Sequence, residues 1–131
     1  MAQTVLGLVR PDELGVTLTH EHLLVDLSGN FGPPDEASAR DLFHAPLTPE
    51  TLGRIRYHGA LNADNYRLLD VDTAITEANL FRQYGGGTIV DATSIGIARD
   101  PVGLARISRA TGVNVVMGAA FYVSDAHPAY V

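Results

Sequence analysis

The 131 residues include no cysteine, no lysine and no tryptophan. Without cysteine, disulfide bonds and thiolate metal sites are excluded. All nine basic residues are dispersed arginines and the net charge is −6, so the chain lacks the basic cluster that binds a nucleic-acid backbone. No apolar run approaches the ~18 residues of a membrane span, and no secretory leader pattern is present. These absences predict a cytoplasmic protein that binds neither nucleic acid nor a membrane.

The most informative stretch is a β-prone segment, expected to form a strand over 16–22, that carries His20 and His22. Side chains alternate faces along a strand, so the two imidazoles can converge on one point while Glu21 points the other way. Neutral imidazole binds Zn²⁺ and other divalent transition metals, which makes the pair a candidate metal site. Two histidines with this spacing also occur by coincidence, and the spacing alone leaves that alternative open. We expect Glu21 to be satisfied by an arginine or a backbone donor in a helix layer.

The rest of the chain alternates β-prone and helical segments. Short β-prone stretches on either side of residues 10–13, which have turn composition, predict a small hairpin over 4–16. Two strand-and-helix units are expected over 72–131, with helices at 73–84 and 101–111 and strands at 88–91 and 113–118. Asp72 and Asp100 are the expected helix N-caps, and Gly112 is the expected helix end. This order predicts a parallel sheet with right-handed crossovers.

A long connection over 28–67 separates these parts. It opens with a turn-rich stretch, and Thr48-Pro49 predicts the start of a helix that runs to about Tyr57. Connections of this length in a compact domain are usually functional or disordered. A lid over a metal site and a plain surface excursion both remain open.

The residues around the histidine pair resemble a known family. The run 15–23 is similar to the first barrel strand of the phosphotriesterase-like family of the amidohydrolase superfamily, whose signature is Gly, a hydrophobic residue, Thr-Leu, any residue, and His-Glu-His. Three later blocks match in the same order, at 87–93, 96–101 and 107–116. The resemblance runs from about Thr4 to the last residue and is weaker over 28–67. It implies an α/β fold, with residues 1–131 forming the N-terminal part of a (β/α)8 TIM barrel of about three parallel strands, because a full barrel takes ~250 residues.

The resemblance also implies a chemistry. Family members are binuclear zinc hydrolases that act on phosphotriesters, lactones or carboxylic esters through a metal-bridging hydroxide. By this resemblance His20 and His22 are ligands of one metal ion, and Phe121 and Tyr122 lie beside the substrate after the third strand. The alternative for the aromatic pair is ordinary packing at a strand end. The remaining family ligands lie on later strands that have no counterpart in this sequence, and a bridging lysine cannot come from a chain without lysine.

Two other residues and two rival hypotheses complete the expectations. Asp91 and Thr93 follow the second strand, where we expect them to cap the next turn. The main rival to the hydrolase is a non-catalytic partial barrel that acts as a binding or assembly module, or a decayed gene product. Three parallel strands leave two unpaired edges, which predicts self-association and a homo-oligomer. A doubly wound nucleotide-binding domain is disfavoured, because His20 to His22 stand where its glycine-rich loop belongs.

Overall fold

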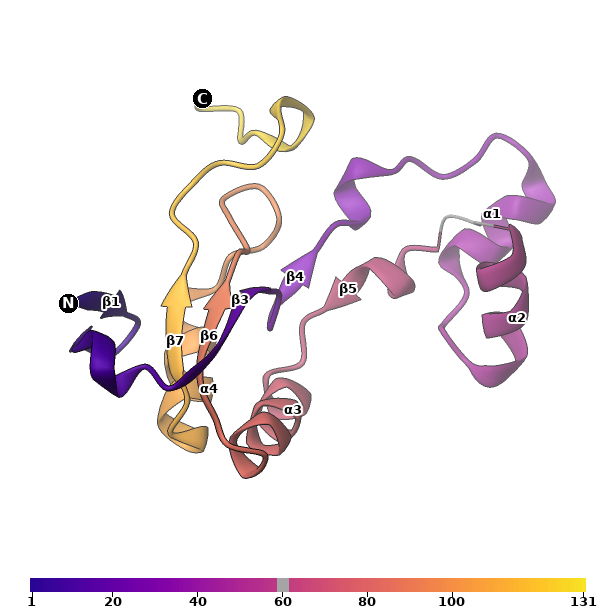
Figure 1. The fold of residues 1–131 in the computed structure, drawn as a ribbon. Helices are drawn as coiled ribbons and strands as arrows, with labels where there is room; N and C mark the ends of the chain where they lie inside the picture. Colours follow the sequence, from indigo (N-terminus) through magenta and orange to yellow (C-terminus); the bar gives the residue numbers. More distant parts are fainter. Residues whose placement is uncertain (59–61) are drawn as a thin grey trace. The chain divides into compact units, whose positions relative to one another are not determined.

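The computed structural model describes residues 1–58 and 62–131, which form two compact units (Figure 1). The first, called here the sheet unit, comprises Met1–Val25 and Leu68–Val131. The second, called here the excursion, comprises Asp26–Arg67. The bounds of the excursion are within two residues of the 28–67 connection described from the sequence.

The sheet unit is built on a three-stranded parallel sheet in the order β3-β6-β7. Its strands are β3 (Val16–Glu21), β6 (Gly86–Asp91) and β7 (Asn114–Met117). Helix α3 (Val71–Gln83) leads into β6, and α4 (Pro101–Thr111) connects β6 to β7 and lies behind these two strands in Figure 1. The helices pack on each other and on the sheet, so the predicted strand-helix alternation is confirmed.

Apolar side chains from the sheet and both helices form the core of this unit. Ala74 and Ala78 stand four residues apart on α3 and so share one face of the helix, and both belong to the buried cluster that also contains residues of α4. Leu104 and Ile107 of α4 are fully buried, and each such side chain stabilises the fold by about 1.5–3 kcal/mol. The remaining members of the core are Leu24, Ile89, Val113 and Val115.

The ends of α4 are those that the sequence predicts. The Asp100 carboxylate accepts hydrogen bonds from the main-chain N–H groups of Val102 and Gly103, and Pro101 occupies the first helical position. Gly112 ends the helix with φ of 68°, a left-handed conformation that glycine adopts without strain.

The predicted cap of α3 is wrong by two residues. Asp70, and not Asp72, is the N-cap, and its carboxylate accepts a hydrogen bond from the N–H of Thr73. Asp72 lies in the first turn and forms an ion pair with Arg106 of α4. A carboxylate two residues further along cannot reach the free N–H groups in the same way, because its own backbone is already helical.

The hairpin also lies earlier than the predicted range of 4–16. Strand β1 (Ala2–Thr4) pairs antiparallel with β2 (Gly7–Val9). The turn between them uses Gly7 at φ of 128° and the Thr4 hydroxyl, which donates to the Gly7 carbonyl. Residues 10–13 are not the turn. Pro11–Glu13 form a 3₁₀ helix, η1, in which the Glu13 carboxylate accepts a hydrogen bond from the Arg10 N–H.

The excursion is an ordered unit with its own small core. It contains α1 (Ala37–His44), α2 (Pro49–His58) and two 3₁₀ turns, η2 (Ser28–Asn30) and η3 (Asp64–Tyr66). The fully buried Asn62 side chain donates hydrogen bonds to the carbonyls of Leu42 and Ala45. The helix predicted over 48–57 is confirmed by α2, whereas α1 was not predicted. Buried apolar side chains complete the core, namely Leu42, Phe43, Ile55 and Ala63.

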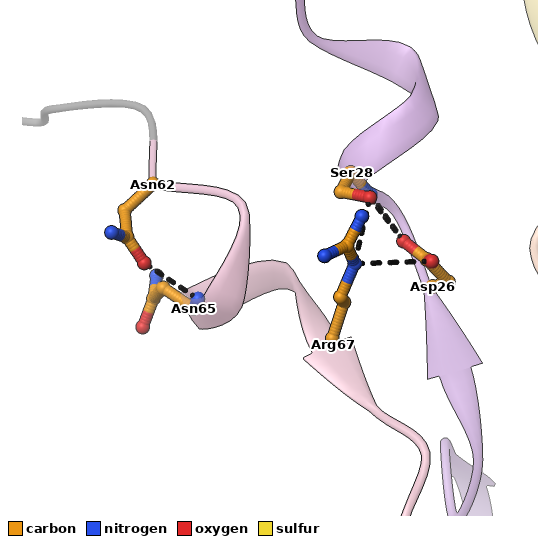
Figure 2. A network of polar contacts seen from close by, with 5 residues as sticks. All are labelled: Asp26, Ser28, Asn62, Asn65 and Arg67. Carbon is orange, nitrogen blue, oxygen red and sulfur yellow. Dashed lines mark hydrogen bonds and ion pairs between the residues drawn. The ribbon is translucent and has the colours of Figure 1, made fainter. Parts of the chain in front are cut away.

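A polar clasp joins the two ends of the excursion (Figure 2). The strands β4 (Val25–Asp26) and β5 (Arg67–Leu68) pair with each other, and the Leu27 N–H donates to the Tyr66 carbonyl. Arg67 Nε lies 3.2 Å from Asp26 Oδ2 and 3.1 Å from Ser28 Oγ, and Ser28 in turn donates twice to Asp26 Oδ1. We call Asp26, Ser28 and Arg67 the clasp.

Candidate metal and substrate site

The two candidate metal ligands lie next to each other at the carboxyl end of β3. His20 is within the strand and His22 follows one residue after its end, so the predicted strand of 16–22 is one residue too long. The ring centroids are 5.6 Å apart and the ring planes are at 76°. Two imidazoles bound to one tetrahedral ion at Zn–N distances of about 2.0–2.1 Å have centroids about 5 Å apart. The observed separation of the two rings is close to that distance.

A β-bulge separates the histidines from the rest of the strand. Leu18 is opposite Ile89, and Glu21 is opposite Asp91, so β3 takes three steps where β6 takes two. The extra residue changes the alternation, and Leu18 and Glu21 both line a hollow of about 280 Å³ against α3. In a regular strand Leu18 and His20 would share a face. The bulge therefore lets Leu18 and Glu21 line one hollow. His22 lines it as well, and His20 does not belong to its lining.

Glu21 differs from expectation in one respect. Its side chain does line the helix side of the sheet, together with Glu77 and Phe81 of α3. The expected arginine partner is not found: among residues 1–58 and 62–131, no ion pair involves Glu21. The residue is exposed, and water can therefore solvate its carboxylate.

His22 is held by a residue that lies shortly beyond the end of the neighbouring strand, β6. Its Nδ1 lies 2.9 Å from Thr93 Oγ1, and Thr93 is fully buried just after β6. The equally buried Asp91 accepts hydrogen bonds from the main-chain N–H groups of Thr93 and Leu23. Asp91 thus caps the following turn, as predicted. The contact of Thr93 with His22 was not predicted, although its place at the carboxyl end of the adjacent parallel strand was a signal for it.

Phe121 and Tyr122 follow β7 and are tied to the loop after β6. Ile95 and Phe121 form a parallel β-bridge, and the Tyr122 N–H donates to the Ile95 carbonyl. Phe121 and Tyr122 are 43% and 38% exposed, and the Phe121 ring lies 5.7 Å from the ring of His127. Within the described ranges, neither aromatic residue makes a ring contact or hydrogen bond with the histidine pair. The side chains of Phe121 and Tyr122 are thus partly exposed and accessible to a ligand.

The described residues do not complete a metal site. In residues 1–58 and 62–131 no group of three or more histidine, cysteine, aspartate or glutamate side chains could hold a metal ion. A catalytic zinc site usually has three protein ligands and one open position, so the histidine pair alone is one ligand short of such a site. In the same ranges no helix is both long enough and apolar enough to span a bilayer.

Comparison with known sequences gives consistent matches. The model of the Phosphotriesterase family matches residues 1–131. N-acetyltaurine hydrolase of Homo sapiens is 40% identical over 129 residues, which cover 95% of this chain and 36% of that protein. A phosphotriesterase-related protein of Nematostella vectensis is 40% identical over 131 residues, which cover 98% of this chain and 37% of that protein. The chain thus spans little more than a third of the length of the curated relatives it matches.

Comparison with solved structures gives the same picture. A resiniferatoxin-binding protein from Rhodobacter sphaeroides superposes with a TM-score of 0.90 and 43% identity, over 98% of this chain and 36% of that one. A lactonase from Listeria monocytogenes superposes with a TM-score of 0.62 and 26% identity, over 95% of this chain and 30% of that one.

Proposed function

Since the chain belongs to the phosphotriesterase family, we propose that it supplies the His20–His22 part of the active site of a zinc-dependent hydrolase. The fold class predicted from the sequence is confirmed, because the three parallel strands and their helices superpose on barrel enzymes of this family. The catalytic activity is a proposal for the protein that completes the barrel, because the chain spans about a third of its relatives.

The observation that carries this proposal is the geometry of the histidine pair. The 5.6 Å separation of the two rings suits a common ion. In the proposed site His20 and His22 bind as neutral imidazoles and orient the ion at the carboxyl end of β3, the end where barrel enzymes carry out catalysis. When bound, divalent metal supplies a water activated near neutral pH and polarises the group under attack. In this proposal the other ligands and the proton acceptor lie on later strands of the complete barrel.

We propose a carboxylic acyl compound as the substrate, hydrolysed by water with cleavage of the acyl C–N or C–O bond. Relatives at 40% identity carry the name N-acetyltaurine hydrolase, and a lactonase is related at 26%. Both names describe attack on a carbonyl carbon. Phe121 and Tyr122 suit a wall of such a pocket, because they offer apolar surface and a phenol that can donate a hydrogen bond. Phosphotriesters are the second candidate substrate class, because the family is named for their hydrolysis.

The test uses the full-length gene product and the variants His20→Ala and His22→Ala. Metal content is measured by plasma mass spectrometry, and hydrolysis is measured on N-acetyltaurine, a γ-lactone, an aryl ester and a phosphotriester. We expect each variant to lose one metal equivalent and most of its hydrolytic rate. His44→Ala, which changes an exposed histidine of α1, is the matched control and should keep both. Unchanged metal content and turnover in both site variants would remove the ligand assignment.

A second candidate is the non-catalytic assembly module, and one observation favours it. Val16 is 64% exposed and Leu18 is 37% exposed on β3, an outer strand of the three-stranded sheet. Apolar side chains on a strand with an open edge promote association of chains. Sedimentation and hydrolysis assays of the native gene product separate the two cases. A 131-residue product that is an obligate oligomer without hydrolysis would support the module, whereas a cooperatively melting monomer or a product that hydrolyses any of the four substrates would count against it.

A further inference from the structure

The hydrogen bond between His22 and Thr93 determines which imidazole nitrogen is free. His22 Nδ1 lies 2.9 Å from Thr93 Oγ1. A threonine hydroxyl can donate to an imidazole nitrogen or accept from one, so the contact occupies Nδ1 and fixes the orientation of the ring. Because Thr93 occupies Nδ1, the nitrogen left for a ligand is Nε2.

We propose that Thr93 is a positioning residue that fixes the ring of His22 through Nδ1 and directs Nε2 to the metal ion. This inference rests on the proposed function. A metal ligand must present a lone pair, so Nε2 binds only when the proton is on Nδ1, and Thr93 Oγ1 then accepts that proton in a hydrogen bond. Thr93 is fully buried, so water does not compete for His22 at this position.

Thr93 is itself fixed by a buried carboxylate. Asp91 Oδ1 accepts the Thr93 N–H at 2.9 Å, and Asp91 Oδ2 accepts the N–H of Leu23 at 2.7 Å. Leu23 is the residue directly after His22. The Asp91 side chain therefore fixes the main chain at Leu23, next to His22, and at Thr93. Together with the His22–Thr93 hydrogen bond, these contacts form a closed ring of four residues. These bonds fix the orientation of His22 through contacts within the protein chain itself.

The first experiment examines His22 in the zinc-loaded, full-length gene product. Nitrogen-15 NMR of the imidazole distinguishes zinc on Nε2 with the proton on Nδ1 from the reverse arrangement. We expect zinc on Nε2 in the natural protein and in Thr93→Ser, which keeps the hydroxyl. We expect Thr93→Val, which has the same shape without the hydroxyl, to lose this preference. A natural protein with zinc on Nδ1 of His22 would overturn the proposal, whether or not the valine variant folds.

The second experiment measures Zn²⁺ affinity by competition with a chelator. Loss of a hydrogen bond to a ligating histidine weakens metal binding about 10–100-fold, and we expect this of Thr93→Val. Thr93→Ser should remain within about threefold of the natural protein on the same basis. Affinity that is unchanged in Thr93→Val but lost in His22→Ala would overturn the positioning role and leave the proposed function intact. Affinity that is unchanged in both variants would overturn the proposed ligand as well.

Discussion

Asp91 accepts a hydrogen bond from the main-chain N–H of Leu23 at 2.7 Å, although 68 residues separate the two in the chain. The other oxygen of the same carboxylate accepts from Thr93 N–H, and the side chain is fully buried. This one residue thus connects the carboxyl ends of β3 and β6. In barrel enzymes those ends carry the active site, so Asp91 supports the site without being one of its ligands.

The first prediction concerns Asp91→Asn. The amide offers one acceptor oxygen where the carboxylate offers two, so one of the two buried N–H donors loses its partner. We expect the free energy of unfolding to fall by about 1–3 kcal/mol, measured by urea denaturation. Asp12→Asn, which removes an exposed ion pair with Arg10, is the matched control, and exposed pairs contribute about 0–1 kcal/mol. Equal effects of the two variants would contradict the structural role of Asp91.

The second prediction concerns the clasp. Arg67→Ala removes the contacts to Asp26 and Ser28, and we expect faster hydrogen exchange at the Leu27 amide, which bonds to Tyr66 beside the clasp. The Arg67 and Asp26 side chains are partly exposed, so the effect should be at most about 1 kcal/mol. Arg54→Ala, at an exposed position of α2, should leave this exchange rate unchanged. A slower or unaltered Leu27 amide in Arg67→Ala would show that the clasp does not stabilise the excursion.

The third prediction is a pH dependence at the same place. Partial burial acts to raise the pKa of Asp26, but the hydrogen bonds from Ser28 and the charge of Arg67 outweigh it and hold the pKa below its usual value. A lowered pKa in the folded state means that the ionised carboxylate stabilises the fold. That stability is complete above the unfolded pKa of about 3.9 and is lost as pH falls through the lower, folded value.

Acid should therefore open the excursion at the clasp. We expect protection of the Leu27 amide, corrected for the intrinsic exchange rate, to decline as pH falls below about 4. In Asp26→Asn, which cannot ionise, this decline should be absent. A decline of the same size in both proteins would assign the acid sensitivity to another group.

The fourth prediction concerns the aromatic pair. Phe121→Ala removes the ring that faces His127 and reduces the apolar surface after β7. Since the ring of Phe121 contacts neither His20 nor His22 in residues 1–58 and 62–131, we expect metal content to stay the same. Relative kcat/KM for bulky and small esters should change by about tenfold, as expected when an apolar contact in a pocket is lost. Tyr84→Ala, at an exposed aromatic residue after α3, is the control. Loss of metal without a change of preference would show that the aromatic pair lies outside the pocket.

Sequence signals near its ends were sufficient to predict an element whose first and last turns are both marked by characteristic residues. Asp100, Pro101 and Gly112 mark α4 without any long-range contact. For α3, Asp70 and Asp72 are both suitable caps, and only the position of the first helical turn decides between them. Helix α1 has no side-chain cap at Glu36, so the sequence gives no clear start for it.

The details of the site depend on pairing between distant segments. The bulge between Leu18 and Glu21 results from the register of β3 on β6, and alternation within one strand cannot reveal it. The bond from Thr93 to His22 joins residues 71 positions apart. The family resemblance identified the histidine pair from its motif. It did not identify the partner of either histidine, because a motif states residue types and not hydrogen bonds.

The two ends of the excursion are bonded to each other, and this has an evolutionary consequence. The Leu27 N–H donates to the Tyr66 carbonyl at 3.0 Å, so the segment begins and ends at one place. None of its described residues, 26–58 and 62–67, belongs to the buried apolar cluster of the sheet unit. A segment with adjoining ends can be lengthened, shortened or replaced without a change in the rest of the fold. We therefore expect that changes in the length of segment 26–67 can be tolerated during evolution without displacing β3 and its histidines.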